Sequence, residues 1–445
     1  MMFRSVHVLI MIVTLVVIRP AFADDHAAAG GPQPGDVLNQ TNWQKAEGLL
    51  PPEILKHYQS GDYVNPIVDW PADKFEWPPD FRAGSEKNAG QLDVNDIGTI
   101  IEKGSGNQPP YLIGFPFPII DKTDPKAGAK IVWNFFYRTW YFGNLYAESQ
   151  LNWVGPTKLE RRSDVDVSFE YYDGVPEGER LPNPENFSVR FLTITVSPSD
   201  LNGTASLSWR YRDPGKRDST WAYVPALRRV RAVSPSNRSD GFLGSDMSQD
   251  DGPFFDGKPE DFTWTLKDEV DQLRLVDPLS LKGESQQEWL PTGGWRGIWP
   301  DLKFIGYMDP EWKGSGWAPL TGALAKRRFY VVEGIPKDKY YLYGRLELYI
   351  DTVTFQGAWN RKFDWRGDLL NTLQIMAFLT KSFTRPDGKV DYNQSSNMAF
   401  QCAENIKRSQ ATVAGIKSNP NGGFDGRITY PPGRFDVSSL SKFGK

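Results

Sequence analysis

Several stretches of the chain alternate apolar and polar residues, the pattern of a β-strand with two unlike faces. The alternation is clear over residues 164–171, 206–212 and 341–351. Residues 190–196 show the same period, and Asn202-Gly203 follows them, so this strand and the next are typical of a hairpin with a short loop. Strands at such close spacing predict a mainly β (α+β) protein built on a large antiparallel sheet.

Helical periodicity is weak by comparison. Asp36 is a candidate cap for a first helical segment, and Pro52–Tyr58 predicts a short helix ended by Gly61. Residues 367–379 fit a later helix or a strand equally well. A further strand is indicated near 411–416.

These patterns divide the chain into four parts. Residues 24–91 predict a flexible leader with short helices and a strap rich in Trp and Pro, whose Trp rings would anchor it to the rest of the protein. Residues 92–380 predict the β domain. We expect 381–445, which are polar and punctuated by Gly and Pro, to form an irregular C-terminal extension that packs on the β domain.

The N-terminus has the three parts of a signal peptide. Arg4 and His7 precede an apolar run from Val8 to Ile18, and 21–23 (Ala-Phe-Ala) supplies the small residues of a cleavage site. A spanning helix needs roughly 20 apolar residues, more than this run contains. We therefore expect export to the periplasm and removal of residues 1–23, with no stable membrane span.

Charge, cysteine and histidine restrict the function further. The chain has 51 Lys and Arg against 55 Asp and Glu, a mildly acidic balance that argues against a nucleic-acid partner. Cys402 is the single cysteine, so an internal disulfide is excluded, and we interpret it as a small buried side chain. We interpret His57 as a solvated residue of its helix. Zinc sites of several His or Cys are excluded, and we predict no metal and no cofactor.

Two stretches carry a resemblance to a known family. The first begins with 114–119 (Gly-Phe-Pro-Phe-Pro-Ile) and continues to 133–134 (Trp-Asn). The second runs from 221–231 (Trp-Ala-Tyr-Val-Pro-Ala-Leu-Arg-Arg-Val-Arg) to the acid-rich segment 240–251. With a weaker match at 345–367, they resemble a family of secreted bacterial proteins of unassigned function, related to outer-membrane lipoprotein-sorting (LolA/LolB-like) proteins.

This resemblance implies a strongly curved antiparallel sheet, an incomplete β-barrel closed by short helices over a hydrophobic cavity. Relatives with that fold carry acyl chains through the periplasm. Members of the larger family tend to be encoded near transporters of the resistance-nodulation-division superfamily, which implies a partner of that type or an outer-membrane protein. The chain is about twice as long as the small lipoprotein carriers, so their specific cargo does not transfer to it.

The second stretch combines basic and acidic residues. Arg228, Arg229 and Arg231 precede a loop that contains Asp246, Asp250 and Asp251. One hypothesis is a structural ion-pair cluster that holds the loop against the sheet. A second is recognition of an anion such as a lipid head group, which suits the bidentate guanidinium. Calcium is a third, although the acids lack EF-hand spacing.

Aromatic residues make up 13% of the chain, with 16 Trp. They serve core packing, but a concave sheet around a ligand cavity needs the same residues on its inner face. The positions that we predict to line such a cavity are Trp133, Phe135, Leu207, Trp209, Tyr211, Trp221, Tyr223, Leu346 and Leu348.

Three functions fit these observations. The first is a non-enzymatic periplasmic carrier for a hydrophobic or amphipathic cargo. The second is a carboxylate-dependent hydrolase of glycans or esters, which an open cleft with two carboxylates about 5–10 Å apart would favour. The third is a scaffold or assembly factor for an outer-membrane complex, which an interior filled by side chains would favour.

Overall fold

The structure of the protein is a computed structural model. This structure describes residues 31–70, 77–281, 286–291, 293–298, 305–379, 383–388, 390–391, 396–416 and 423–443. Residues Pro32–Lys445 form one compact unit. The predicted signal peptide, residues 1–23, and the start of the predicted leader lie outside the described residues.

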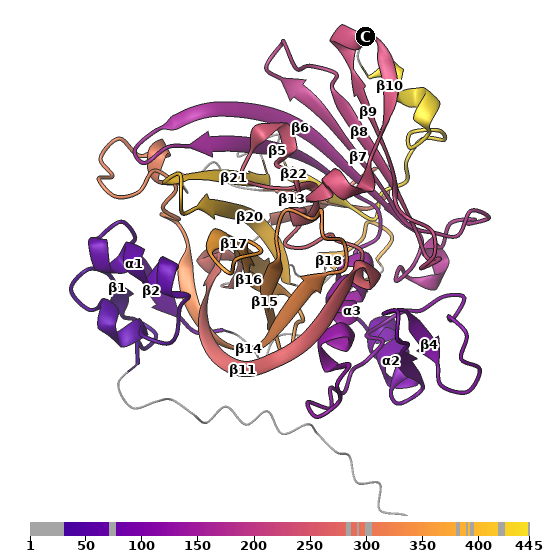
Figure 1. Cartoon of the computed structure of the whole chain (residues 1–445), viewed down its shortest axis with the longest axis horizontal. Helices are drawn as coiled ribbons and strands as arrows, with labels where there is room; N and C mark the ends of the chain where they lie inside the picture. Colours follow the sequence, from indigo (N-terminus) through magenta and orange to yellow (C-terminus); the bar gives the residue numbers. More distant parts are fainter. Residues whose placement is uncertain are drawn as a thin grey trace, which may run out of the picture. The chain divides into compact units, whose positions relative to one another are not determined.

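In the described part of the chain, eighteen strands belong to one sheet, whose main body is a continuous antiparallel series (Figure 1). In spatial order the series is β10 (Arg229–Val233), β9 (Ser219–Val224), β8 (Ala205–Tyr211), β7 (Phe187–Ser197), β6 (Leu159–Tyr171), β5 (Leu145–Val154), β21 (Gln410–Ile416), β20 (Ser396–Asn405), β17 (Leu369–Leu379), β16 (Gly357–Phe363), β15 (Arg345–Asp351), β14 (Ala323–Pro336) and β11 (Phe262–Val276).

One end of this series curls back on itself and the other stays open. The far end of β11 meets β17 in parallel through one bridge, Val276 to Ala377. Among the described strands, β10 pairs with β9 alone. The right-handed twist of each strand pair accumulates over so many strands and bends the sheet. The result is a mainly β protein with an incompletely closed barrel, as predicted.

The remaining elements are short. The small strands are β1 (Val37–Leu38), β2 (Asn65–Val68), β3 (Leu92–Val94), β4 (Ile100–Glu102), β12 (Gln286–Trp289), β13 (Trp295–Ile298), β18 (Phe383–Thr384), β19 (Val390–Asp391) and β22 (Gly423–Gly426). The α-helices are α1 (Pro52–Ser60), α2 (Pro79–Asn88), α3 (Ala127–Trp140) and α4 (Pro278–Leu281). Single 3-10 turns are η1 (Trp43–Ala46), η3 (Glu177–Glu179), η4 (Pro225–Leu227), η5 (Pro235–Ser239), η6 (Phe242–Gly244), η7 (Gln249–Asp251), η8 (Pro259–Asp261), η9 (Gly306–Met308) and η10 (Val437–Lys442).

The predicted strands are present, except that the one predicted over 341–351 begins at Arg345. The predicted helix near residue 52 is also present. The pattern at 164–171 lies in β6, the 190–212 pair forms the β7–β8 hairpin, and 411–416 lies in β21. Helix α1 begins at Pro52 and ends before Gly61, whose φ of 86° is the left-handed conformation that glycine adopts at a helix end. The segment after Asp36 is instead strand β1, paired with β2. Residues 369–379 form strand β17.

Helix α3 was not predicted from the sequence, nor were the long strands β11 and β14. The β-branched and aromatic residues of α3 favour strands, but nearly all of them are buried around the whole helix circumference. A helix that is apolar on every side belongs inside a protein. Gly128 allows α3 to approach β11 closely, since a Cβ there would lie 2.8 Å from the backbone of Thr265.

The predicted irregular extension, residues 381–445, is partly regular, and half of its described residues lie in strands. Strands β20 and β21 lie in the middle of the sheet, between β17 and β5. The C-terminal turn η10 covers the outer face of β8 and β9, where Phe435 and Leu440 pack. The β domain therefore needs this part of the chain, because without it β5 and β17 would be exposed edges.

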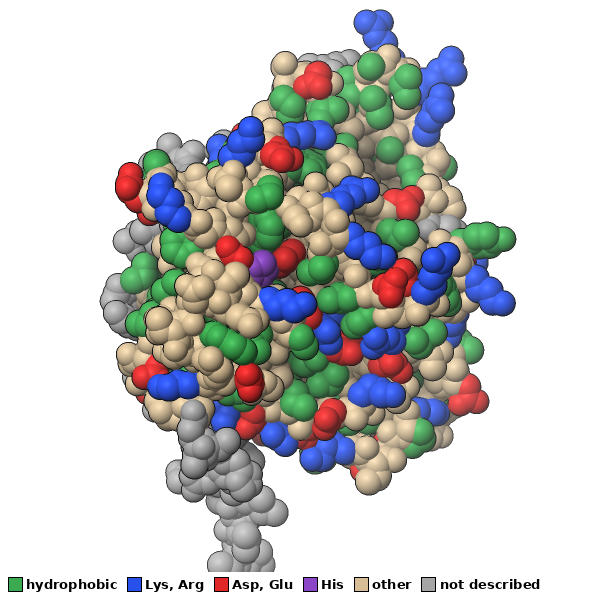
Figure 2. Space-filling view, turned by 60° about the vertical axis from the view of Figure 1, so that its left-hand side comes forward, with side chains coloured by type: hydrophobic (Ala, Val, Ile, Leu, Met, Phe, Trp, Pro, Cys, Tyr) green, Lys and Arg blue, Asp and Glu red, His purple; other side chains and the backbone are tan. Residues whose placement is uncertain are grey.

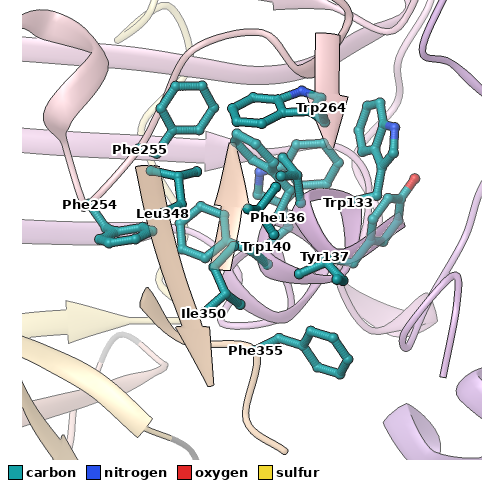
Figure 3. Packing of buried hydrophobic residues seen from close by; sticks show 14 of the residues in the cluster. Trp133, Phe136, Tyr137, Trp140, Phe254, Phe255, Trp264, Leu348, Ile350 and Phe355 are labelled. Atoms are coloured by element: carbon teal, nitrogen blue, oxygen red, sulfur yellow. The ribbon is translucent and has the colours of Figure 1, made fainter. Parts of the chain in front are cut away.

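The largest core cluster lies where α3 meets β11, β15 and the segment around Phe254 (Figure 3). Aromatic rings dominate it: the ring centroids of Phe135 and Phe254 lie 5.3 Å apart, and those of Phe255 and Trp264 lie 5.2 Å apart. A second cluster packs α1 and the first strands against β11 and β17. This packing attaches the described N-terminal residues to the sheet.

The predicted strap, residues 61–91, is more regular than expected. It contains β2 and α2, and residues 71–76 lie outside the described residues. Its Trp side chains do act as contacts: the Trp77 ring stacks on Phe81 at 4.5 Å, and Trp70 lies under the Arg327 guanidinium at 5.0 Å.

Candidate functional site

A cavity of about 230 Å³ lies between the sheet, α3 and the segment 242–254. Strand β6 supplies one wall through the apolar face that the sequence predicts, Val165 to Tyr171. The full lining is Phe135, Arg138, Thr139, Phe142, Leu145, Ala147, Ser149, Leu151, Val165, Val167, Phe169, Tyr171, Phe191, Thr193, Ser206, Phe242, Met247, Ser248, Gln249, Gly252, Pro253, Phe254, Gln356, Gly357, Ile375, Met398, Gln401, Ala414, Gly415 and Phe424.

The wall is mainly aliphatic and aromatic, with a few polar groups. Thr193 and Ser206 face each other across β7 and β8, and Gln249 and Gln401 add amide groups. Among the described residues, no carboxylate, His or Cys lines the cavity. Such a surface suits an apolar body with a small number of hydrogen bonds.

Arg138 on α3 is the charged group of the wall. It is buried, and its guanidinium lies over the ring of Phe142 at 5.6 Å. Burial, together with the charge of nearby Arg274, lowers its pKa to about 9, and the charge of Asp351 opposes both. Arg138 therefore stays protonated at neutral pH and gives the cavity a positive group.

Of the predicted lining residues, Phe135 is on the cavity wall. Trp133, Leu346 and Leu348 instead belong to the aromatic core beside α3. Because α3 is a helix, Trp133 and Phe135 point in different directions, and Trp133 donates a hydrogen bond to the carbonyl of Gly98 at 2.8 Å.

The predicted residues on β8 and β9 face away from the cavity. Leu207 and Tyr223 pack against Phe435 and Leu440, and this outer cluster also includes Trp209 and Trp221. Tyr211 lies in another small cluster, which includes Tyr172 and Phe187. The alternation was right but the assignment of faces was reversed, because the C-terminal segment covers the apolar side.

The structure does not bring the predicted Arg and Asp residues together. Asp246 accepts hydrogen bonds from Asn405 and Gln410, each at 2.9 Å. Asp250 accepts from Arg238 Nε at 2.6 Å and from the Tyr341 hydroxyl at 2.9 Å.

Asp251 has a separate partner. It forms a 2.5 Å salt bridge with Lys362 Nζ and also accepts the Ser248 backbone N–H at 2.7 Å. The acid-rich segment is thus held against the sheet by Lys362 on β16 and by Asn405 and Gln410 on β20 and β21. Arg238 pairs with Asp250 from the adjacent turn η5, and none of these partners belongs to the predicted cluster. Arg228, Arg229 and Arg231 are exposed on the β9–β10 hairpin.

His57 is not solvated. Its side chain is 12% exposed, stacks on the Tyr63 ring at 4.4 Å, and bonds through Nε2 to Glu404 at 2.8 Å. Burial opposes protonation of His57, but the hydrogen bond and charge of Glu404 outweigh it and raise the pKa above 6.5. This pair ties α1 to β20. Cys402 is buried beside it, as predicted, and burial raises the pKa of its thiol well above 9.

Several cavity residues were missed because they lie on elements without a clear sequence signal. Met398, Ala414 and Phe424 come from the predicted irregular extension, and Phe142 follows the unpredicted helix α3. The sequence indicated a strand at 411–416, which contains Ala414, but it did not indicate that this strand pairs with β5.

The described residues contain no group of His, Cys, Asp or Glu arranged to hold a metal ion. None of their helices has the length and apolar character needed to cross a membrane.

Residues 37–273 match the model of a family described as "Protein of unknown function (DUF1329)". The chain belongs to this family. A curated relative is an uncharacterized protein of Pseudomonas aeruginosa, 23% identical over 294 residues, in a match that covers 62% of this chain and 56% of that protein. The match thus spans little more than half the length of that relative.

Solved structures with similar folds include another member of the family. A DUF1329 protein from Desulfovibrio piger is 17% identical, with a TM-score of 0.46, over 72% of this chain and 100% of that one. A domain assigned to outer-membrane lipoprotein sorting from Vibrio parahaemolyticus is also 17% identical over the same shares, with a TM-score of 0.45. A LolA superfamily protein from Nitrosomonas europaea is 11% identical, with a TM-score of 0.37, over 68% and 94%.

Proposed function

We propose that this protein is a periplasmic carrier that holds a hydrophobic or amphipathic, lipid-like molecule in the cavity between β5–β8 and α3. The cavity is the observation that carries the proposal. Its volume of about 230 Å³ exceeds the roughly 150 Å³ of an engineered apolar cavity that binds benzene. An interior filled by side chains, as expected for a scaffold, would not contain this space.

The energetics favour an apolar ligand. Transfer of each methylene group from water into such a cavity contributes about 0.8 kcal/mol, so even a short acyl segment gains several kcal/mol. Arg138 and the wall hydroxyls of Thr193 and Ser206 supply donors that orient a polar end. The wall offers no pair of carboxylates among its described residues, so the cavity gives no specific support to the hydrolase.

The cellular setting follows from the N-terminus. The signal-peptide pattern of residues 1–23 supports export, and a periplasmic carrier needs a donor and an acceptor for its cargo. A transporter of the resistance-nodulation-division type or an outer-membrane protein fits either role. The identity of the cargo is open to direct measurement.

The proposal is tested by identifying and displacing the cargo. Protein purified from its own periplasm is examined by native mass spectrometry, and bound molecules are extracted. A fluorescent fatty acid then serves as the probe for Ala414→Trp, which fills the cavity, and for Ala232→Trp, which places the same ring on the exposed strand β10. We expect the first variant to lose at least tenfold in affinity and the second to bind like wild type.

Two results would count against a carrier. One is a protein that carries no small molecule and does not bind the probe. The other is an Ala414→Trp variant that folds, as judged by thermal unfolding, and still binds the probe as tightly as Ala232→Trp.

A further inference from the structure

The turn between β9 and β10 gathers exposed basic side chains. Arg228 sits at the turn with a φ of 49°, and Arg229 and Arg231 follow on β10. All three are exposed, and no described residue forms a salt bridge or side-chain hydrogen bond with them. Leu227 beside them is 51% exposed. The three guanidinium groups therefore do not hold the fold together.

The β5–β6 turn adds to this basic surface. Because the strands are antiparallel, the β5–β6 and β7–β8 turns lie at the same end of the sheet as the β9–β10 turn. Lys158, Arg161 and Arg162 are exposed at the start of β6 beside Glu160. The β7–β8 turn has no basic residue and contains Asp200. This end is basic in a chain whose net charge is −4.

Figures 1 and 2 show the β9–β10 end of the sheet. β9 and β10 lie at the upper end of the sheet in Figure 1, and Lys and Arg side chains project from the upper end in Figure 2. We call the exposed basic residues of the β5–β6 and β9–β10 turns the basic end.

The basic end lies next to one side of the cavity. Thr193 and Ser206, a facing pair on β7 and β8, line the cavity and lie a few residues from the β7–β8 turn. Helix α3 closes the other side, where Gly174 follows β6 and a Cβ there would lie 2.8 Å from Trp140. The basic end and helix α3 thus lie on different sides of the cavity.

We propose that the basic end docks on the surface of an anionic lipid bilayer. Guanidinium groups bind phosphate in a bidentate manner, and basic residues close to an anionic surface attract it strongly. The unpaired arginines complement the charged head groups of such a bilayer, and the exposed Leu227 complements the apolar layer beneath them. Docking alone does not depend on the cargo, whereas its use in moving cargo between bilayer and cavity rests on the proposed function.

The experiment is vesicle co-sedimentation with the full mature protein. The probes are phosphatidylcholine vesicles with and without phosphatidylglycerol, each at low and high salt. One variant combines Arg228→Gln, Arg229→Gln and Arg231→Gln. The control makes the same charge change at three exposed basic residues of α2 and of the turn after β4, Arg82→Gln, Lys87→Gln and Lys103→Gln.

We expect wild type to bind the anionic vesicles selectively and salt to weaken that binding. The hairpin variant should lose roughly 100-fold in partition, which corresponds to about 1 kcal/mol for each arginine, and the control should bind like wild type. Equal binding of both triple variants would overturn the proposal. Equal binding of wild type to vesicles with and without phosphatidylglycerol would also overturn it. The arginines would then protect an open sheet edge from pairing or contact an acidic protein. Probe binding in the cavity is measured separately, so failure of docking and failure of the carrier function are distinguishable.

Discussion

The Lys362–Asp251 pair fixes one wall of the cavity, and its removal is the sharpest test of the site. Lys362 lies on β16, and Asp251 ends the turn η7 in the segment that contributes Met247 and Ser248 to the cavity wall. The side chains are 1% and 2% exposed, with 2.5 Å between Nζ and the carboxylate. Changing Lys362 to Met removes the cation at nearly constant length and leaves the carboxylate buried.

The magnitude follows from burial. Two unit charges about 3 Å apart attract by roughly 5 kcal/mol at an effective dielectric constant of about 20, although desolvation of both groups offsets much of this. The cost of removing one partner of a buried pair is about 3–5 kcal/mol, because the other charge stays uncompensated. We expect Lys362→Met to cost this much and Asp251→Asn somewhat less, since the amide oxygen can still accept the Ser248 N–H.

The assay is urea unfolding followed by Trp fluorescence, combined with probe binding. The double variant should be less destabilised than the sum of the single variants by more than 1 kcal/mol. Arg229→Ala is the control and should change stability by less than about 0.5 kcal/mol, because Arg229 is exposed and unpaired. Additive effects, or a Lys362→Met variant within 1 kcal/mol of wild type, would refute the reasoning.

Three further outcomes are expected. Burial raises the pKa of Glu260 from its usual 4.5 to about 7. The free energy of unfolding should therefore fall as pH rises from 4.5 to 8, by about 3 kcal/mol, and Glu260→Gln should remove this pH dependence. The same pH dependence of stability in wild type and in Glu260→Gln would contradict this. The pKa of His57 is raised beside Glu404, so the stabilisation by protonated His57 is complete below pH 6.5 and lost above the raised pKa, and His57→Ala should destabilise the protein more at pH 5 than at pH 9. The variants His57→Ala and Cys402→Ser should both bind cargo nearly as well as wild type. A loss of binding without a loss of stability would show that one of these residues has a functional role. N-terminal sequencing of the exported protein should begin at Asp24 within a few residues, and detection of Met1 on it would disprove cleavage.

Local signals in the sequence determined the individual strands. The period of two in 164–171 and 206–212 and the Asn202-Gly203 turn require neighbouring residues alone, so β6, β7 and β8 were predictable. The same holds for α1, whose Pro52 and Gly61 mark its ends. The family membership rested on motifs that are likewise local in the chain.

Tertiary structure decided which face of each strand meets the cavity. The alternating pattern predicts that Leu207 and Ser206 point to opposite faces of the sheet. Which of these faces is covered depends on where Phe435 and η10 pack, and these lie more than two hundred residues later in the chain. In the same way, the aromatic residues of α3 became helical because every side of that segment found a partner in the core. Pairing partners of buried charges, such as Lys362 for Asp251, are set by the three-dimensional path of the chain, because Coulomb attraction selects what is near in space rather than what is near in sequence.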